Sequence, residues 1–351
     1  MRGYGCSICV AGTHGKTTTT SMMSHVLLEG ECDPTIMLGG ELDVIGGNMR
    51  LGDSDYFLTE ACEYHCSFLE FFPKIAVITS VDADHLDFFK DLNHIKQAFT
   101  EFAAIPDEEG YVVVCGDDAN AMECIKDARA QVITYGIGEE NIFCPENLSY
   151  QDGCGEFDVE YDGEIIHVKL QAVGEHNVKN ALACFAAGYA IGLDGAKIAK
   201  GLEAFALVHR RFERKGSCRG AVVVDDYAHH PTEIKCTLQT AARLCEGKLY
   251  VVFQPHTYTR TMLLLDEFTE AFDDADEIIV TDIYAAREKD NGKIHARDLV
   301  ERLQKRGRAA RYVSGFDEIV DILRGTLQEG DMVITMGAGN VYKIGEQIIE
   351  Q

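Results

Sequence analysis

Short apolar runs alternate with amphipathic stretches along almost the whole chain. In the first part, strands are predicted at Cys6–Ala11, Tyr56–Glu60, Ile75–Val81 and Tyr111–Cys115, and helices at Thr17–Glu29, Leu92–Ala104, Ala119–Asp127 and Val178–Ile191. Residues 143–170 alternate apolar and polar positions around Asp-Gly pairs at Asp152 and Asp162, which predicts antiparallel hairpins. Strands that alternate with helices indicate an α/β fold with mostly parallel sheets.

The same alternation restarts after about Val208. Strands are predicted at Ala221–Asp225, Leu249–Phe253, Glu277–Thr281, Ala310–Val313 and Met332–Thr335, and helices at Thr232–Cys245, Leu263–Phe272, Ala296–Arg306, Asp317–Gly325 and after Gly339. The charged segment His209–Gly220 shows neither the apolar periodicity of a helix nor that of a strand, and is predicted to be a linker. We therefore expect two domains, residues 1–207 and 208–351, which suits 351 residues at roughly 150 per domain.

Composition excludes several classes of partner. The net charge of −26 repels a phosphate backbone, so we expect no nucleic acid partner. No run reaches the ~18 apolar residues that span a bilayer, and the N-terminus is too polar for a signal peptide, so we expect a cytoplasmic protein without membrane insertion. The thirteen cysteines are scattered, and Cys6 and Cys9 should face opposite sides of a strand, which disfavours disulfides and a metal or redox site.

The most informative motif is AGTHGKTTTT at residues 11–20, between a predicted strand and a predicted helix. Its glycines allow backbone N–H groups to face a phosphate, its lysine supplies positive charge, and the following threonine offers a hydroxyl to magnesium. The spacing of the first glycine is shorter than in the usual P-loop pattern. We assign to the nucleotide site Gly12, Thr13, His14, Gly15, Lys16, Thr17 and Thr18.

Acidic residues follow two further predicted strands. Glu60 ends one strand, with Glu63 three residues on, and DADHLD at residues 82–87 follows another. The carboxyl ends of parallel strands meet at one edge of a sheet, where carboxylates and an imidazole suit a divalent cation beside phosphates. Helix capping or the helix dipole accounts equally well for single acids, but poorly for His85.

GEHNVKNALA at residues 174–183 puts Asn177 and Asn180 at the start of a helix. An Asn amide pairs well with the edge of an adenine, and Asn is equally a good helix cap. These residues alone leave both roles open.

Eight motifs, in order and across nearly the whole chain, resemble the Mur ligases of peptidoglycan synthesis: GTHGKTTTT, EACEY, DADHLD, GEHNVKNALA, HRRFE, VVVDDYAHHPTEI, FQPHTYTRT and ITMGAGN. The pairing of DDYAHHPTE with QPHTYTRT is typical of the branch that joins L-alanine to UDP-N-acetylmuramate, and of its recycling relative. The resemblance implies a central P-loop ATPase-like domain followed by a Rossmann-like C-terminal domain. The family's first, uridine-nucleotide-binding domain is expected to be missing, so we expect weak or no turnover from these residues alone.

The resemblance also implies roles for single residues. Lys16 and Thr17 would handle the β- and γ-phosphates and Mg²⁺, and Glu60 and His85 would hold a second cation. The remaining assignments are adenine for Asn177 and Asn180, the terminal phosphates for Arg211, the ribose for Asp226, and the incoming amino acid for Tyr227, His229, His256 and Arg260. Among these we expect Arg260 to clamp the carboxylate of the amino acid. Thr257 and Asn340 depart from the Arg and Asp common in relatives.

The activity that the resemblance implies is amide formation. ATP converts a carboxylate into an acyl phosphate, an amine attacks it, and ADP and phosphate leave, with ATP and Mg²⁺ required. The expected substrates are UDP-N-acetylmuramate, L-alanine and ATP. Three alternatives remain: the recycling ligase that attaches a preformed peptide, a folate-type polyglutamate ligase, and a nucleotide-binding fragment without turnover.

Overall fold

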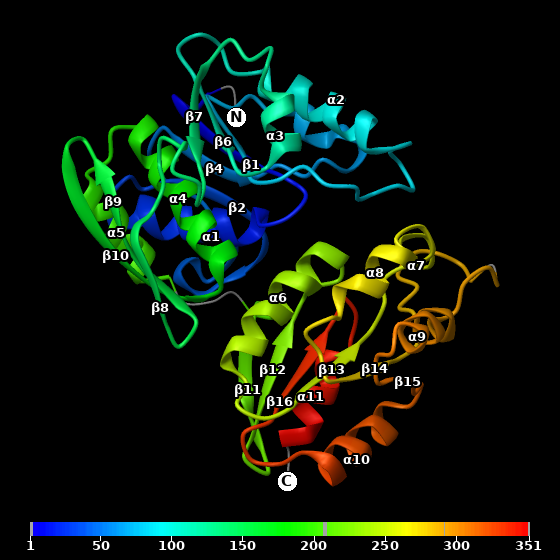
Figure 1. Cartoon of the computed structure of the whole chain (residues 1–351). Coiled ribbons are helices and arrows are strands. Elements are labelled where there is room, and N and C mark those ends of the chain that lie inside the picture. Colours follow the sequence, from blue (N-terminus) through cyan, green and yellow to red (C-terminus); the bar gives the residue numbers. More distant parts are fainter. Residues whose placement is uncertain (1–2, 206–208, 291, 350–351) are drawn as a thin grey trace. The chain divides into compact units, whose positions relative to one another are not determined.

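The computed structural model describes residues 3–205, 209–290 and 292–349. The chain divides into two compact units, Met1–Val208 and His209–Gln351 (Figure 1). The domain boundary predicted between residues 207 and 208 lies outside the described residues.

Within its described residues, the first unit contains a seven-stranded sheet of order β3-β2-β4-β1-β5-β6-β7. All neighbouring pairs are parallel except β2 and β3, which form an antiparallel hairpin at one edge. The strands are β1 Cys6–Ala11, β2 Thr35–Leu42, β3 Gly47–Arg50, β4 Tyr56–Glu60, β5 Ile75–Ile78, β6 Tyr111–Cys115 and β7 Gln131–Tyr135. The helices are α1 Lys16–Glu29, α2 Leu92–Ala103, α3 Ala119–Cys124, α4 Glu175–Ala190 and α5 Gly195–Glu203.

Helices cover both faces of this sheet, which explains why its central strands are apolar throughout. Ile8 and Val10 of β1 pack in one core with α1 and α4, whereas Cys9 and Ala11 face a second core with α2 and α3 (Figure 1). Cys6 packs against the first core, opposite to Cys9, as the strand period predicts. All thirteen cysteines fall within the described residues and are free thiols.

A separate three-stranded antiparallel sheet confirms the hairpins predicted from the Asp-Gly pairs. Its strands are β8 Glu146–Gln151, β9 Cys154–Tyr161 and β10 Glu164–Val173. Asp152 and Asp162 have φ of 51°, and the glycine after each also has a positive φ, as a two-residue hairpin turn requires.

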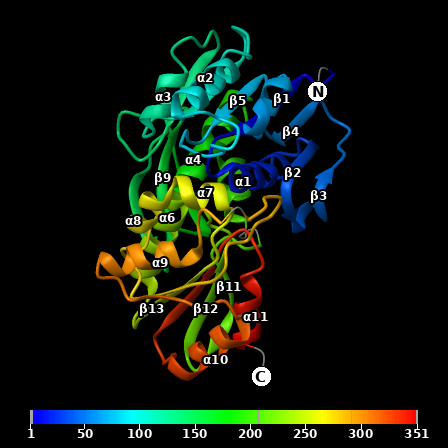
Figure 2. The ribbon, with the colours of Figure 1, turned by 90° about the vertical axis from the view of Figure 1, so that its right-hand side faces the viewer.

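The described part of the second unit contains a six-stranded sheet of order β11-β12-β16-β13-β14-β15, parallel except for β11 against β12. Its strands are β11 Glu213–Cys218, β12 Ala221–Asp226, β13 Leu249–Phe253, β14 Glu277–Val280, β15 Ala310–Tyr312 and β16 Met332–Met336. Its helices are α6 Pro231–Leu244, α7 Tyr258–Leu263, α8 Leu265–Ala271, α9 Ala296–Lys305, α10 Phe316–Thr326 and α11 Tyr342–Ile349. Figure 2 shows α10 and α11 on one side of the sheet and α8 and α9 on the other, the layering of a Rossmann-like fold.

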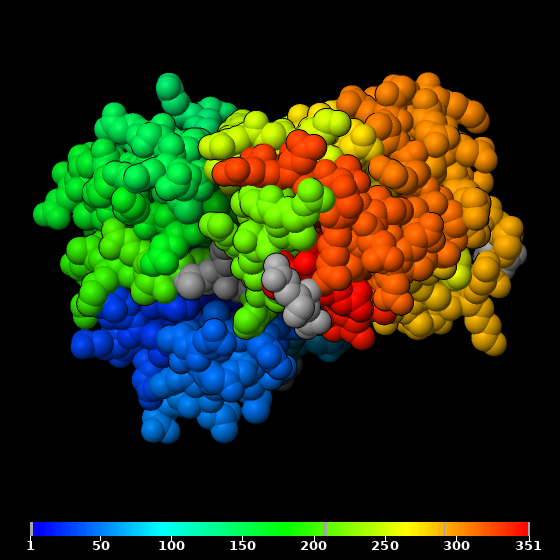
Figure 3. Space-filling view, turned by 90° about the horizontal axis from the view of Figure 1, so that it is seen from below, coloured from blue at the N-terminus to red at the C-terminus, as the bar shows by residue number. Residues whose placement is uncertain are grey.

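Six helices and strands among the described residues were absent from the sequence expectations: β2, β3, β7, α5, β11 and α7. The segment predicted as a linker is largely β11, because an edge strand paired on one side tolerates the charges of Glu213, Arg214 and Lys215. Strand β3 is likewise polar and lies at an edge, in the blue surface region of Figure 3. The predicted helix Leu263–Phe272 corresponds to α8, and Leu264 separates α8 from α7, which overlaps the predicted helix only at Leu263.

No helix among the described residues is both long enough and apolar enough to cross a membrane.

Candidate active site

The phosphate-binding loop predicted at residues 12–15 joins β1 to α1, as its sequence requires. Gly12 and Gly15 have φ of 142° and 83°, and a Cβ on Gly12 would lie 1.9 Å from the hydroxyl of Thr79, so neither position accepts a side chain without strain. Helix α1 begins after Gly15 with no side-chain cap, whereas α2 is capped by Asp91. The first N–H groups of α1, from Lys16 onward, are therefore available to an anion.

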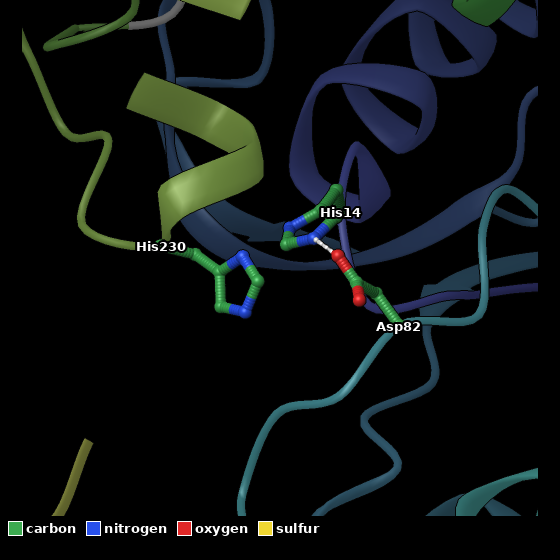
Figure 4. Close-up of side chains that lie close together, drawn as sticks. All are labelled: His14, Asp82 and His230. Carbon is green, nitrogen blue, oxygen red and sulfur yellow. Dashed lines mark hydrogen bonds and ion pairs between the residues drawn. The ribbon is translucent and has the colours of Figure 1, made fainter. Parts of the chain in front are cut away.

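Hydrogen bonds tie this loop to the segment that follows β5. Thr13 N donates to Ser80 O over 2.9 Å, and His14 N donates to the Ser80 hydroxyl over 2.9 Å. His14 Nε2 lies 3.1 Å from a carboxylate oxygen of Asp82 (Figure 4). His230, also labelled in Figure 4, belongs to the second unit, where its imidazole caps α6. Asp82, one of the acids considered for a cation, therefore also fixes His14.

Lys16 is held by oxygens on several sides. Its ammonium donates to both carboxylate oxygens of Glu63, over 2.9 and 3.2 Å, and to the carbonyl groups of Gly12 and Thr13. The Glu63 side chain is only 3% exposed. Burial acts to lower the pKa of Lys16, but the charge and hydrogen bond of Glu63 outweigh it and raise that pKa above its usual value.

Glu60 and His85 contact different residues of this region. Glu60 ends β4, next to β1, and its carboxylate accepts from the Thr17 hydroxyl over 3.1 Å and from Gly39 N over 2.8 Å. His85 Nε2 lies 3.7 Å from Glu63 Oε1. The hydroxyl and the two carboxylates beside the phosphate loop are oxygen donors that suit Mg²⁺ beside phosphates, and the imidazole adds a nitrogen donor for a divalent cation. The residues present therefore fit the cation that the family implies.

Asn177 and Asn180 connect α4 to the base of the phosphate loop. Asn180 Oδ1 accepts from the Thr19 hydroxyl over 3.1 Å, and Asn180 Nδ2 donates to Asn177 Oδ1 over 3.1 Å. Asn177 Nδ2 donates to Val173 O over 2.8 Å. Both side chains are buried, and a Cβ on Gly15 would lie 2.9 Å from Asn180 Oδ1. Their amides hold α1 and α4 together, and contact with adenine stays a prediction.

The two adjacent arginines at the start of the second unit have different surroundings. Arg210 Nε donates to the buried carboxylate of Asp225 over 2.9 Å, and its other nitrogens donate to two backbone carbonyl groups in the loop after β16. The guanidinium groups of Arg210 and Arg211 both lie over the ring of Tyr227, at 5.0 and 5.2 Å. The hydrogen bonds of Arg210 make it a structural residue, whereas the charge of Arg211 acts on the nearby carboxylate of Asp226, and its contact with phosphates stays a prediction.

Asp226, expected to contact a ribose, is bonded within the protein. One carboxylate oxygen accepts from Ala228 N and the other from Phe212 N, both over 2.7 Å. Burial raises the pKa of Asp226 from 3.8 to about 6, because the charged form is poorly solvated there. Asp226 therefore holds the loop after β12 against the segment that carries Arg211, and a ribose contact stays a prediction.

The four residues expected to surround an amino acid lie together at the carboxyl ends of β12 and β13. The ring of His229 lies 5.4 Å from that of Tyr227 and 5.5 Å from that of His256. Arg260 Nη1 donates to His256 O over 2.9 Å and lies 3.0 Å from His256 Nδ1. Tyr284, which the sequence analysis missed, stacks on His256 with ring centres 5.8 Å apart.

Both departures from the family pattern have partners in the same region. The Thr257 hydroxyl donates to Glu288 over 2.8 Å, and Thr259 N donates to the other oxygen of Glu288 over 2.9 Å. Asn340 accepts from the amide of Gln254 over 3.1 Å. Glu288 thus anchors the loop that carries His256.

Two models of one protein family match the chain, one in each unit. The family model described as "Mur ligase middle domain" matches residues 10–188, and the model described as "Mur ligase, glutamate ligase domain" matches residues 210–339. A UDP-N-acetylmuramate–L-alanine ligase of Caldanaerobacter subterraneus subsp. tengcongensis is 50% identical over 353 residues, covering 100% of this chain and 77% of the relative. The chain belongs to the Mur ligase family.

Solved structures of Mur ligases place the fold in the same family. The crystal structure of UDP-N-acetylmuramate-alanine ligase from Thermotoga maritima is 30% identical, with a TM-score of 0.80 over 99% of this chain and 75% of that chain. A MurF ligase of Thermotoga maritima in complex with ADP is 18% identical, with a TM-score of 0.77 over 99% of this chain and 80% of that chain, and shows the fold alone. The predicted α/β fold class is confirmed, and Mur ligases are ATP-dependent enzymes, as the phosphate loop requires.

Proposed function

We propose that this Mur ligase joins L-alanine to the carboxyl group of UDP-N-acetylmuramate, with ATP consumed to form an acyl phosphate. The observation that carries the proposal is that one chain combines a phosphate-binding loop with a cluster of imidazole, phenol and guanidinium groups suited to a small amino acid. Relatives 50% identical over the whole chain are UDP-N-acetylmuramate–L-alanine ligases. Residues 1–207 would form the ATP-binding domain and residues 208–351 the Rossmann-like domain, and a cytoplasmic location stays a prediction.

In the first unit, we assign the triphosphate to the loop from Gly12 to Thr18. Backbone N–H groups at the start of α1 would bind the phosphate oxygens, and Lys16 would face the γ-phosphate. Asn177 and Asn180 would act beside the adenine from the start of α4. The hydrogen bonds of Thr13 and His14 to the segment after β5 support a loop whose shape is set before the nucleotide arrives.

Thr17, Glu60 and His85 are the residues that we assign to divalent cations. Bound Mg²⁺ would screen the negative charges of the γ-phosphate and the substrate carboxylate as they approach. Glu60 is already oriented by Thr17 and Gly39, so its carboxylate is fixed at the end of β4. His85 is held beside Glu63, and its imidazole would bind as the neutral form.

In the second unit, we assign the amino acid to the cluster around His256. Arg260 would clamp the carboxylate of L-alanine, because a guanidinium binds a carboxylate with two parallel hydrogen bonds. Tyr227 and His229 would form one wall and Tyr284 another, leaving room for a small side chain. Arg211 would approach the terminal phosphates, and Asp226 would contact the ribose.

The test supplies the 351-residue chain with MgATP, UDP-N-acetylmuramate and one acceptor at a time. Mass spectrometry then detects the amide product, which is visible even when turnover is low. We expect product with L-alanine and little with a tripeptide. A tripeptide that reacts better than L-alanine would instead identify the recycling ligase, and nucleotide binding without any product would favour the fragment without turnover.

A further inference from the structure

The ammonium of Lys16 has no proton left for a phosphate in this structure. It carries three protons and faces four oxygens, two from Glu63 and one each from the backbone of Gly12 and Thr13. A lysine that contacts a γ-phosphate must first release one of these partners. Glu63 is the charged one among them, and its side chain is only 3% exposed.

Glu63 also has a second partner within reach. Its Oε1, which also accepts from Lys16 over 3.2 Å, lies 3.7 Å from His85 Nε2. The ring of Tyr64 packs 4.6 Å from that of His85 and holds it in place, and the Tyr64 hydroxyl donates to Asp87 over 2.8 Å. A small rotation of the Glu63 side chain would therefore exchange the ammonium of Lys16 for the imidazole of His85.

Electrostatics gives this exchange a direction. A triphosphate that reaches Lys16 meets the buried negative charge of Glu63 a few ångströms away, in a region where Glu60 already adds another carboxylate. Without a divalent cation, the repulsion opposes binding of the γ-phosphate. With a cation beside Glu60 and His85, the same carboxylate gains an attractive neighbour when it leaves Lys16.

We propose that Glu63 is a positioning residue that neutralises Lys16 until the γ-phosphate replaces it, and that then turns toward His85. This inference rests on the proposed function only in taking ATP as the nucleotide. It makes Glu63 the group that favours metal-bound over metal-free ATP. The residue thereby couples occupation of the cation site to release of Lys16.

The test is a calorimetric titration of the 351-residue chain with ATP and with ADP, each in EDTA and in Mg²⁺. Glu63→Gln removes the competing charge, so we expect metal-free ATP to bind on the order of tenfold more tightly, as an unscreened charge a few ångströms from a phosphate implies. Metal-free ADP, which lacks the γ-phosphate, should change little. The gain in ATP affinity on adding Mg²⁺ should shrink by a similar factor.

Three further variants separate this role from a structural one. Glu63→Asp keeps the charge and should restore most of the dependence on Mg²⁺. Glu60→Gln removes a proposed cation ligand and should weaken binding of MgATP, which Glu63→Gln should not. Glu109→Gln removes an exposed charge, 89% accessible, and should change neither value.

The ratio of ATP to ADP affinity within one protein does not depend on the fraction that is folded. This ratio can therefore be compared with that of the unaltered chain even if Glu63→Gln is destabilised. An unchanged ratio in EDTA, or weaker binding of metal-free ATP, would overturn the role of Glu63. Failure of the unaltered chain to bind MgATP at all would instead overturn the proposed function.

Discussion

Arg210 and Asp225 form an ion pair at the start of the second unit, with Nε and Oδ2 2.9 Å apart and the Asp225 side chain 1% exposed. Arg211, the next residue, has no part in this pair, although both guanidinium groups lie over the ring of Tyr227. Two neighbouring residues of the same type therefore divide two tasks, one of holding the sheet edge and one of presenting positive charge.

This division predicts opposite effects of two alanine substitutions. Arg210→Ala should lower the free energy of unfolding by about 3 kcal/mol, because it leaves the Asp225 carboxylate buried without its partner. Arg211→Ala should cost no more than about 0.5 kcal/mol of stability, as surface substitutions usually do, and should weaken binding of MgATP. Denaturant unfolding and calorimetry on both variants measure the two effects. A larger loss of stability in Arg211→Ala would contradict the assignment.

Lys16→Ala should abolish measurable MgATP binding and also destabilise the first unit. The buried Glu63 carboxylate then loses its ammonium partner and keeps only the neighbouring imidazole of His85, at a cost of about 3 kcal/mol. The double variant Lys16→Ala/Glu63→Gln should recover most of the stability and none of the nucleotide affinity. Calorimetry and denaturant unfolding on the single and double variants test this, and equal ATP affinity for Lys16→Ala and the unaltered chain would exclude Lys16 from the phosphate site.

Arg260→Ala should raise the KM for L-alanine at least about tenfold, since a charge-assisted hydrogen bond to a carboxylate contributes about 1.5–3 kcal/mol. Arg260→Lys should recover part of this, because an ammonium keeps the charge but loses the paired geometry. Product formation at varied L-alanine concentration gives the KM, with MgATP affinity expected to stay constant. Arg308→Ala, at a surface ion pair with Asp273, is the matched control. An unchanged KM for Arg260→Ala would favour a peptide as acceptor.

Asp226 should make stability depend on pH. Burial raises its pKa from 3.8 to about 6, so the folded protein binds this proton more tightly than the unfolded chain does. Its contribution to stability is therefore complete below about pH 4 and is lost as the pH rises through about 6. The stability of the unaltered chain relative to Asp226→Asn should be greater at about pH 4 than at about pH 7.5, by about 3 kcal/mol at about 1.4 kcal/mol per pKa unit. Thermal or denaturant unfolding across this range measures it, and the exposed Asp274→Asn should show no such trend.

Much of the nucleotide site could be predicted from sequence because its geometry is local. A strand, two glycines, a lysine and a helix follow each other within residues 6–29, and each step has one physical reading. Glu60 was placed correctly at the phosphate loop because it ends a strand that neighbours β1 in the sheet. The family resemblance placed His256 and Arg260 in one site, and the structure shows them in contact across the start of α7.

The partners of these residues depend on contacts distant in sequence, which no local pattern encodes. The ion pair of Lys16 with Glu63 joins residues 47 positions apart, and Glu63 lies just before a turn in which His65 and Cys66 have positive φ. Stacking of Tyr284 on His256 likewise depends on how two loops after parallel strands meet. Strand β11 was missed for another reason. Its charged sequence resembles that of a linker, and the segment is a strand only because it pairs with β12.

The hydrogen bonds of Thr13 and His14 to Ser80 bear on the thermodynamics of nucleotide binding. Fixing the backbone of one residue costs roughly 1–2 kcal/mol in conformational entropy. In the ligand-free protein this cost has already been met by folding, because the loop is anchored to a neighbouring strand end. Because the loop is already ordered, binding of the triphosphate carries little further entropic cost for ordering the loop. Replacing Ser80 with alanine, which removes the bond from His14 N, would return part of that entropy to the unbound state and weaken every nucleotide alike, whatever its number of phosphates.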